Sequence, residues 1–172
     1  MEKPVFLIGF MGSGKTTWGK KLANALSVPF IDLDHELVNK IGMSIPEYFQ
    51  LHGEAKFREL EKEMLLEQEN RLGIISTGGG TPCYFDNMDW LLSHGTVLYL
   101  KHSPKSLFHR LSNSDIQKRP ALQGLQGEAL LAFIDSKLNE RAIYYDRAHI
   151  VIDQINTSLE DLVALVKQQD LV

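Results

Sequence analysis

Apolar residues along the chain gather in five short runs that are hydrophobic almost without interruption. Strands that are covered on both faces have this pattern, whereas strands with one face in water alternate between apolar and polar positions. The runs therefore predict the buried strands of a parallel sheet, at residues 5–10, 29–33, 73–77, 96–100 and 150–153.

Helical spacing of apolar residues fills the intervals between these runs. Apolar positions recur every three or four residues across 15–26 and 54–70, shorter patterns lie at 86–93 and 104–111, and a longer one lies at 127–144. Capping boxes, in which Ser or Thr precedes Glu by three residues, predict helix starts at Ser44 and Thr157. Strand and helix thus alternate, which predicts an α/β fold: a three-layer sandwich with a five-stranded parallel sheet and right-handed crossovers.

The alternation continues over all 172 residues without a repeat, a low-complexity tract or a linker. A chain of this length typically forms one domain, so we expect a single domain over 1–172. Only the polar stretch 112–126 has no clear periodicity. A loop this long inside a compact domain is commonly functional, and we expect a mobile lid there.

Charge and composition exclude several classes of protein. Eighteen Lys and Arg against 22 Asp and Glu give a net charge of −4, which is wrong for a protein that coats nucleic acid. No apolar stretch approaches the roughly 20 residues of a membrane helix. The single cysteine, Cys83, excludes an intramolecular disulfide and a multi-cysteine zinc site. We expect a cytoplasmic protein with no nucleic-acid or membrane partner.

The acidity is uneven along the chain. Residues 101–119 contain five Lys and Arg but only one acid, a local charge of +4 that leaves −8 for the rest. A small polyanion could therefore bind a protein whose average charge is negative.

Residues 9–16, Gly-Phe-Met-Gly-Ser-Gly-Lys-Thr, match the phosphate-loop pattern G-x-x-x-x-G-K-[ST] between a predicted strand and a predicted helix. Glycines let successive backbone N–H groups point at phosphate oxygens, and the helix N-terminus adds partial positive charge. Lys15 is expected to reach the β- and γ-phosphates, and the Thr16 hydroxyl to bind Mg²⁺. The segment predicts a nucleotide site made by Gly12, Ser13, Gly14, Lys15, Thr16 and Thr17.

Two carboxylates, Asp32 and Asp34, stand at the end of the second predicted strand. Open α/β sheets bind ligands at the carboxyl ends of their strands, and side chains two apart on a strand point the same way. Both acids can therefore face the γ-phosphate, one near Mg²⁺ and the other receiving the proton of an acceptor hydroxyl. Alternatively, the pair only caps the following helix, for which Asp34 is suitably placed.

Six segments together resemble the shikimate kinase family, in the family's order and nearly from end to end. They are 9–17, 30–34 (Phe-Ile-Asp-Leu-Asp), 53–61 (Gly-Glu-Ala-Lys-Phe-Arg-Glu-Leu-Glu), 76–80 (Ser-Thr-Gly-Gly-Gly), 119–122 (Arg-Pro-Ala-Leu) and 141–149. The resemblance implies a P-loop NTPase fold with a lid, substrate-binding helices within about 35–70, and a monomer. It also implies transfer of the ATP γ-phosphate to the 3-hydroxyl of shikimate with Mg²⁺.

The resemblance further implies roles for residues of the acceptor site. Arg58 and Arg141 match the family's carboxylate-binding arginines, and a guanidinium fork suits a carboxylate. Asp34 would bind the ring hydroxyls and accept the proton, while Gly79 and Gly80 let the backbone approach the substrate.

On the nucleotide side, Arg119 resembles the family's lid arginine that reaches the phosphates, and Arg110 matches a position beside the adenine. Other interpretations stay open at this point. Arg58 also has the spacing for ordinary ion pairs with Glu54 and Glu61 on one helix. The acceptor could be gluconate or a nucleoside monophosphate, and the chain could be a nucleotide-binding regulatory module.

Overall fold

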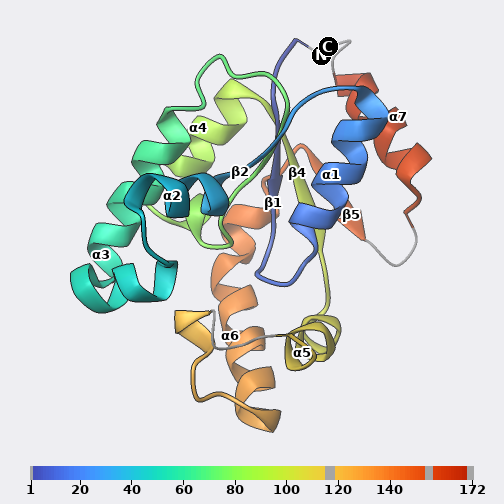
Figure 1. Ribbon diagram of the computed structural model, residues 1–172. Helices are drawn as coiled ribbons and strands as arrows, with labels where there is room; N and C mark the ends of the chain where they lie inside the picture. The colour runs from blue at the N-terminus through green and yellow to red at the C-terminus, as the bar shows by residue number, and fades with distance from the viewer. Residues whose placement is uncertain (1, 115–118, 154–156, 170–172) are drawn as a thin grey trace.

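The computed structural model describes residues 2–114, 119–153 and 157–169. Five parallel strands form its sheet in the order β2-β3-β1-β4-β5 (Figure 1). Each lies within or beside one of the predicted apolar runs, which confirms the predicted sheet. The strands are β1 (Val5–Ile8), β2 (Phe30–Asp32), β3 (Ile74–Ser76), β4 (Thr96–Lys101) and β5 (Ile150–Asp153).

Helices cover both faces of this sheet, as Figure 1 shows. Alternate residues of β1 point to opposite faces: Val5 and Leu7 pack with α1 and α7, whereas Phe6 and Ile8 pack with α3, α4 and α6. The three-layer α/β sandwich is thus confirmed. The helices are α1 (Lys15–Leu26), α2 (Leu33–Ile41), α3 (Ile45–Leu66), α4 (Asn87–His94), α5 (Pro104–Ser112), α6 (Gly127–Tyr145) and α7 (Leu159–Gln169), with short 3₁₀ turns η1 (Thr81–Cys83) and η3 (Pro120–Leu122).

Helix α3 differs from the prediction of a helix beginning at residue 54. It starts at the predicted capping box, where the Ser44 hydroxyl accepts a bond from the Glu47 backbone and the Glu47 carboxylate accepts one from the Ser44 N–H. The helix is then broken at Gly53, which has φ 78° and ψ 171°. Only glycine adopts such a conformation without strain, and the break sets the direction of the half-helix that carries Arg58.

The second capping box is one residue later than predicted. The Ser158 hydroxyl accepts a bond from the Asp161 N–H at 3.1 Å, and the Asp161 carboxylate accepts one from the Ser158 N–H at 3.1 Å. Thr157, the predicted cap, instead donates its hydroxyl to the Asp153 carbonyl at 3.0 Å, at the end of β5. The prediction of a Thr157–Glu160 pair was therefore wrong, because the threonine is used by the preceding strand.

The predicted lid, 112–126, contains ordered structure where it is described. Helix α5 continues to Ser112, and η3 places Leu122 in a cluster with Phe10, α5 and α6. Residues 115–118 lie outside the described part of the chain, and the lid's mobility stays a prediction. Among the described residues, no helix has the length and apolar character needed to cross a membrane.

Candidate active site

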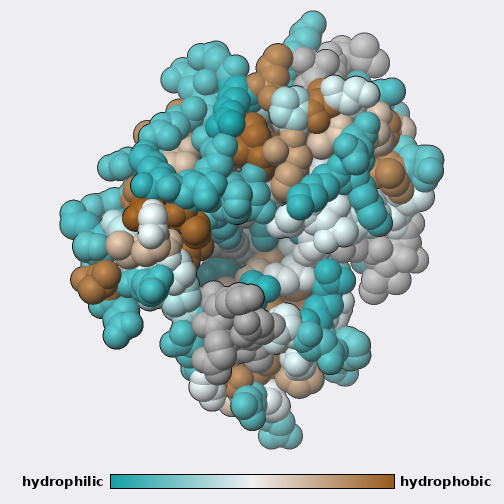
Figure 2. Space-filling model, in the orientation of Figure 1, coloured by the Kyte–Doolittle hydropathy of each residue, from teal (hydrophilic) through white to brown (hydrophobic). Residues whose placement is uncertain are grey.

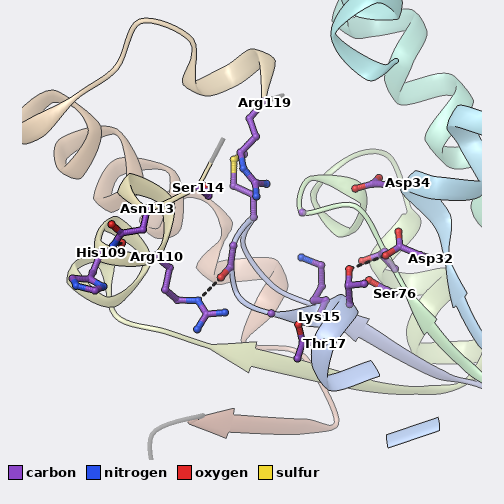
Figure 3. Close-up of a pocket in the computed structure, with 16 residues that line it drawn as sticks. Lys15, Thr17, Asp32, Asp34, Ser76, His109, Arg110, Asn113, Ser114 and Arg119 are labelled. Carbon is purple, nitrogen blue, oxygen red and sulfur yellow. Dashed lines mark hydrogen bonds between the residues drawn. The ribbon is translucent and has the colours of Figure 1, made fainter. Parts of the chain in front are cut away.

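A cleft of about 580 Å³ opens at the carboxyl ends of the central strands, between the start of α1 and the α5–η3 region. The hollow is visible in the middle of the face shown in Figure 2, and its lining is drawn in Figure 3. Ser13 is fully buried within the phosphate loop and does not line the cleft. The lining brings together the predicted residues Gly12, Gly14, Lys15, Thr16, Thr17, Asp32, Asp34, Gly79, Arg110 and Arg119.

Lys15 folds back onto the phosphate loop. Its ammonium donates to the carbonyl oxygens of Gly9 at 2.8 Å and Phe10 at 3.2 Å. Burial lowers the pKa of Lys15 to about 8, although the nearby carboxylates of Asp34 and Asp32 favour the charged form. An ammonium held in this way is placed to exchange weak carbonyl partners for anionic phosphate oxygens.

Thr16 and Asp32 form one pair of oxygen donors at the cleft. The Thr16 hydroxyl donates to the Asp32 carboxylate at 2.8 Å, and the other Asp32 oxygen accepts from the His35 N–H at 3.4 Å. The capping role that the sequence also allowed for Asp34 is therefore taken by Asp32, the N-cap of α2. The described residues contain no group of three or more His, Cys, Asp or Glu that could together hold a metal ion. Two hard oxygen donors suit Mg²⁺, which is commonly bound by one or two protein groups together with substrate phosphates and water.

Asp34 lies half-buried in the first turn of α2, where its carboxylate faces charges of both signs. Burial raises its pKa to about 6, the acids Glu61 and Asp32 add to the rise, and Lys15 and Arg58 oppose it. Figure 3 shows Lys15, Asp34 and Arg119 entering the same space from different elements. A carboxylate in this position can be ionised at neutral pH and still accept a proton.

A smaller pocket of about 140 Å³ adjoins the cleft. It is lined by the predicted acceptor residues, together with aromatic side chains from both halves of α3. Both cavities share Met11, Asp34, Gly79 and Arg119, so a ligand in each would meet at these residues. The smaller pocket is lined by Phe49, Phe57, Arg58, Glu61, Gly80 and Arg141, among others.

Arg58 makes both of the ion pairs that its helical spacing allowed. Its Nε and Nη2 donate to one oxygen of Glu54 at 3.2 and 2.9 Å, and its Nη1 donates to Glu61 at 2.5 Å. The pair with Glu61 is not an ordinary surface pair, because the side chain of Arg58 is only 12% exposed and that of Glu61 only 5%. Glu61 also accepts the Thr81 hydroxyl at 2.8 Å. The sequence indicated Glu61 only as an ion-pair partner of Arg58, through its spacing, and not as a residue that lines the site.

Arg141 reaches the site from α6 and is held by the glycine turn. Its Nη1 donates to the Gly79 carbonyl at 3.3 Å, and its guanidinium lies 5.2 Å from the Phe10 ring. The buried Tyr145 hydroxyl donates to the same carbonyl at 2.5 Å. Tyr145 was missed because a tyrosine one turn after an arginine in an amphipathic helix is more often core.

Position 80 requires glycine because the guanidinium of Arg58 lies close to its backbone, and not because of an unusual backbone angle. A Cβ at this position would lie 2.5 Å from Nη1 of Arg58. On the nucleotide side, the Nε of Arg110 donates to the Gly12 carbonyl at 2.6 Å, the contact dashed in Figure 3. Arg119 stands at the start of η3 and lines both cavities. The structure thus brings the predicted site residues into two adjoining cavities, with Ser13 directly behind one of them.

Known proteins resemble this chain over nearly its whole length. The sequence model of the family described as Shikimate kinase matches residues 11–170. The shikimate kinase of Bacteroides fragilis is 46% identical over 167 residues, which cover 92% of this chain and 93% of that protein. The crystal structure of shikimate kinase from Bacteroides thetaiotaomicron has a TM-score of 0.86 at 38% identity and covers 99% of both chains. Shikimate kinase from Acinetobacter baumannii in complex with shikimate also has a TM-score of 0.86, at 33% identity, covering 98% of this chain and 93% of its own. On this evidence, the chain belongs to the shikimate kinase family.

Proposed function

We propose that this protein transfers the γ-phosphoryl group of ATP to the 3-hydroxyl of shikimate, a step toward chorismate and the aromatic amino acids. The observation that carries the proposal is that the phosphate-loop cleft and the arginine pocket meet at Asp34 and Arg119. In this reaction a bond forms between the acceptor oxygen and the γ-phosphorus. The bond from that phosphorus to the bridging oxygen breaks, ADP leaves, and the hydroxyl proton passes to Asp34.

On the nucleotide side, Lys15 would leave the carbonyls of Gly9 and Phe10 and contact the β- and γ-phosphates. Gly12 and Gly14 line the cleft and would present backbone N–H groups to the phosphates, with the buried Ser13 between them in the loop. Thr17, in the first turn of α1, lines the same side of the cleft. Arg119 adds positive charge from the lid, and Arg110 lies on the side where the adenine would bind. Catalysis of this kind rests mainly on positioning and charge neutralisation.

The pair Thr16 and Asp32 would hold Mg²⁺, Thr16 through its hydroxyl and Asp32 through its carboxylate or a bound water. Bound there with the nucleotide, the ion would neutralise charge on the β- and γ-phosphate oxygens. The 2.8 Å contact between the two side chains places both donors on one side of the cleft.

On the acceptor side, Arg58 and Arg141 would bind the shikimate carboxylate, and the backbone at Gly79 and Gly80 would contact the ring. Asp34 would orient the 3-hydroxyl and take its proton. Because its pKa is about 6, Asp34 is ionised at neutral pH and is a stronger base than an exposed aspartate.

An ADP-release assay tests the proposal directly. Shikimate, gluconate and several nucleoside monophosphates are supplied in turn with ATP and Mg²⁺, and we expect ADP release to depend on shikimate alone. Turnover with gluconate or a nucleoside monophosphate, but none with shikimate, would overturn the acceptor assignment. ATP binding without turnover of any acceptor would favour a regulatory module.

Substitution of Arg58 by Ala tests the acceptor site itself. Loss of a charge-assisted contact to the carboxylate should raise the KM for shikimate roughly 10- to 100-fold and leave the KM for ATP within about twofold. Arg71→Ala is a matched control, because Arg71 also forms a bidentate pair, with Glu36, but is half-exposed and outside both cavities. Equal shikimate dependence in both variants would remove Arg58 from the site.

The proposal also includes a monomeric, cytoplasmic enzyme formed by one domain over 1–172, with no nucleic-acid or membrane partner. The net charge of −4 and the free thiol of Cys83 support it, because free thiols are typical of reducing compartments. Light scattering during size-exclusion chromatography would test the monomer.

A further inference from the structure

The segment after β3 contacts the charged residues of α3 at several points around Arg58. Thr81 donates to Glu61, and Gly80 lies directly against Nη1 of Arg58. Tyr84, which follows η1, presents its ring to the guanidinium, with the Cζ of Arg58 4.2 Å from the ring centroid. Its hydroxyl donates at 2.9 Å to Glu54, to the same oxygen that accepts Nε and Nη2 of Arg58.

We infer that Tyr84 is a positioning residue that fixes the guanidinium of Arg58 for an acceptor carboxylate, an inference that rests on the proposed function. Tyr84 lines neither cavity, so it acts through Arg58. The described contacts of Arg58 use three of the five N–H groups that a guanidinium carries, two toward Glu54 and one toward Glu61. One N–H therefore remains on each terminal nitrogen, available to a ligand in the pocket.

Two physical effects make Tyr84 suitable for this role. A cation over an aromatic face is attracted by the ring quadrupole, and the contact to Tyr84 is closer than those to Phe57 at 5.4 Å and Phe49 at 5.9 Å. The bond from Arg58, with a smaller contribution from Tyr84, also lowers the pKa of Glu54, so its carboxylate stays charged between them. The Tyr84 ring holds the face of the guanidinium, and Glu54 holds one of its edges. A long side chain fixed in this way loses less conformational entropy when a ligand binds.

The neighbouring residue provides a matched comparison. Phe85 is also an aromatic residue beneath a cation, but that cation is Lys62, whose Nζ lies 5.3 Å from the ring, and Phe85 is 57% exposed. Tyr84 and Phe85 thus carry similar contacts, one directed at the acceptor site and one at the surface.

The test compares Tyr84→Leu, Tyr84→Phe and Phe85→Leu by steady-state kinetics with shikimate and ATP varied separately. Tyr84→Leu should raise the KM for shikimate roughly 5- to 30-fold, the loss that one partly buried cation–π contact corresponds to. Its KM for ATP and its kcat should stay within about twofold, because Arg58 binds only the acceptor. Tyr84→Phe keeps the ring but loses the bond to Glu54, so it should recover most of the loss and still leave the KM for shikimate raised about 2- to 4-fold. Phe85→Leu should resemble wild type.

A KM for shikimate within twofold of wild type in Tyr84→Leu would overturn the inference, as would an equal rise in the KM for ATP. If circular dichroism shows that the leucine variant is unfolded, Tyr84→Phe decides: a KM for shikimate raised at least twofold, with the KM for ATP unchanged, supports positioning through Glu54, and no change overturns it. An inactive wild type would overturn the proposed function, and the inference with it. An active wild type with insensitive variants would overturn the inference alone.

Discussion

Substitution of Asp34 by Asn should separate the activity of this protein from its stability. The carboxylate is half-buried near two other acids, Glu61 and Asp32, and burial together with these charges raises its pKa to about 6 from the ordinary 3.8. An ionised Asp34 is therefore unfavourable in the folded protein without ligands. The amide has nearly the same shape and carries no charge, so we expect the variant to fold more stably than wild type at neutral pH while losing turnover.

The sign and size of this change in folding stability follow from proton linkage. The folded protein binds the Asp34 proton more tightly than the unfolded chain does, so this group's contribution to stability is fully present below pH 3.8 and is lost as the pH rises through about 6. Each pKa unit corresponds to about 1.4 kcal/mol, and a rise of about two units therefore gives at most about 3 kcal/mol. Because water reaches part of the side chain, we expect Asp34→Asn to gain about 1–2 kcal/mol.

Urea unfolding followed by circular dichroism measures this gain at several pH values. The difference in free energy of unfolding between the variant and wild type should be near zero at about pH 4 and should reach its full value above about pH 7. Asp32→Asn is the control: its carboxylate accepts bonds from Thr16 and His35, so its replacement should bring no gain. A variant less stable than wild type at neutral pH, or a difference independent of pH, would refute the reasoning.

Two further substitutions test the remaining parts of the site. Lys15→Ala removes the ammonium that would contact the phosphates, and kcat for ADP release should fall at least roughly 100-fold; a near-normal kcat would contradict the assignment of the cleft. Gly80→Ala would place a methyl group 2.5 Å from Nη1 of Arg58, so the guanidinium must move. We expect the KM for shikimate to rise roughly 10- to 100-fold with the KM for ATP little changed, and equal rises in both would show general damage instead.

What the sequence predicted well was encoded locally. The strand runs and the phosphate loop each depend on a few consecutive residues whose chemistry leaves one structural solution, and the structure contains both. The sequence also placed Thr16 and one of the two aspartates near a common Mg²⁺, and the structure brings Thr16 and Asp32 into hydrogen-bond contact, because a loop after β1 and the end of β2 lie at one edge of a parallel sheet. The family resemblance supplied Arg58 and Arg141, which periodicity alone would have assigned to the surface and to a helix end.

What the sequence missed depends on tertiary contacts. Glu61, Tyr84 and Tyr145 each look ordinary in their own helix or turn, and only packing of the segment after β3 against α3 and α6 gives them partners in the site. The shifted capping box has a similar cause, because the bond from Thr157 to the end of β5 could not be foreseen from the box pattern. Local sequence patterns therefore identified the residues proposed to bind substrates, whereas the residues that position them could be identified only from the tertiary structure.

Burial shifts the pKa values of Lys15 and Asp34 in opposite directions. Both side chains leave water for the cleft, and burial favours their neutral forms, lowering the pKa of Lys15 to about 8 and raising that of Asp34 to about 6. Between these values both groups carry the charge that phosphoryl transfer needs. Phosphates beside Lys15 would favour its charged form, so nucleotide binding recovers part of the free energy that the empty cleft costs. Desolvation of this site therefore has two consequences: an ionised Asp34 destabilises the folded protein, and a charged Lys15 is stabilised when nucleotide phosphates bind beside it.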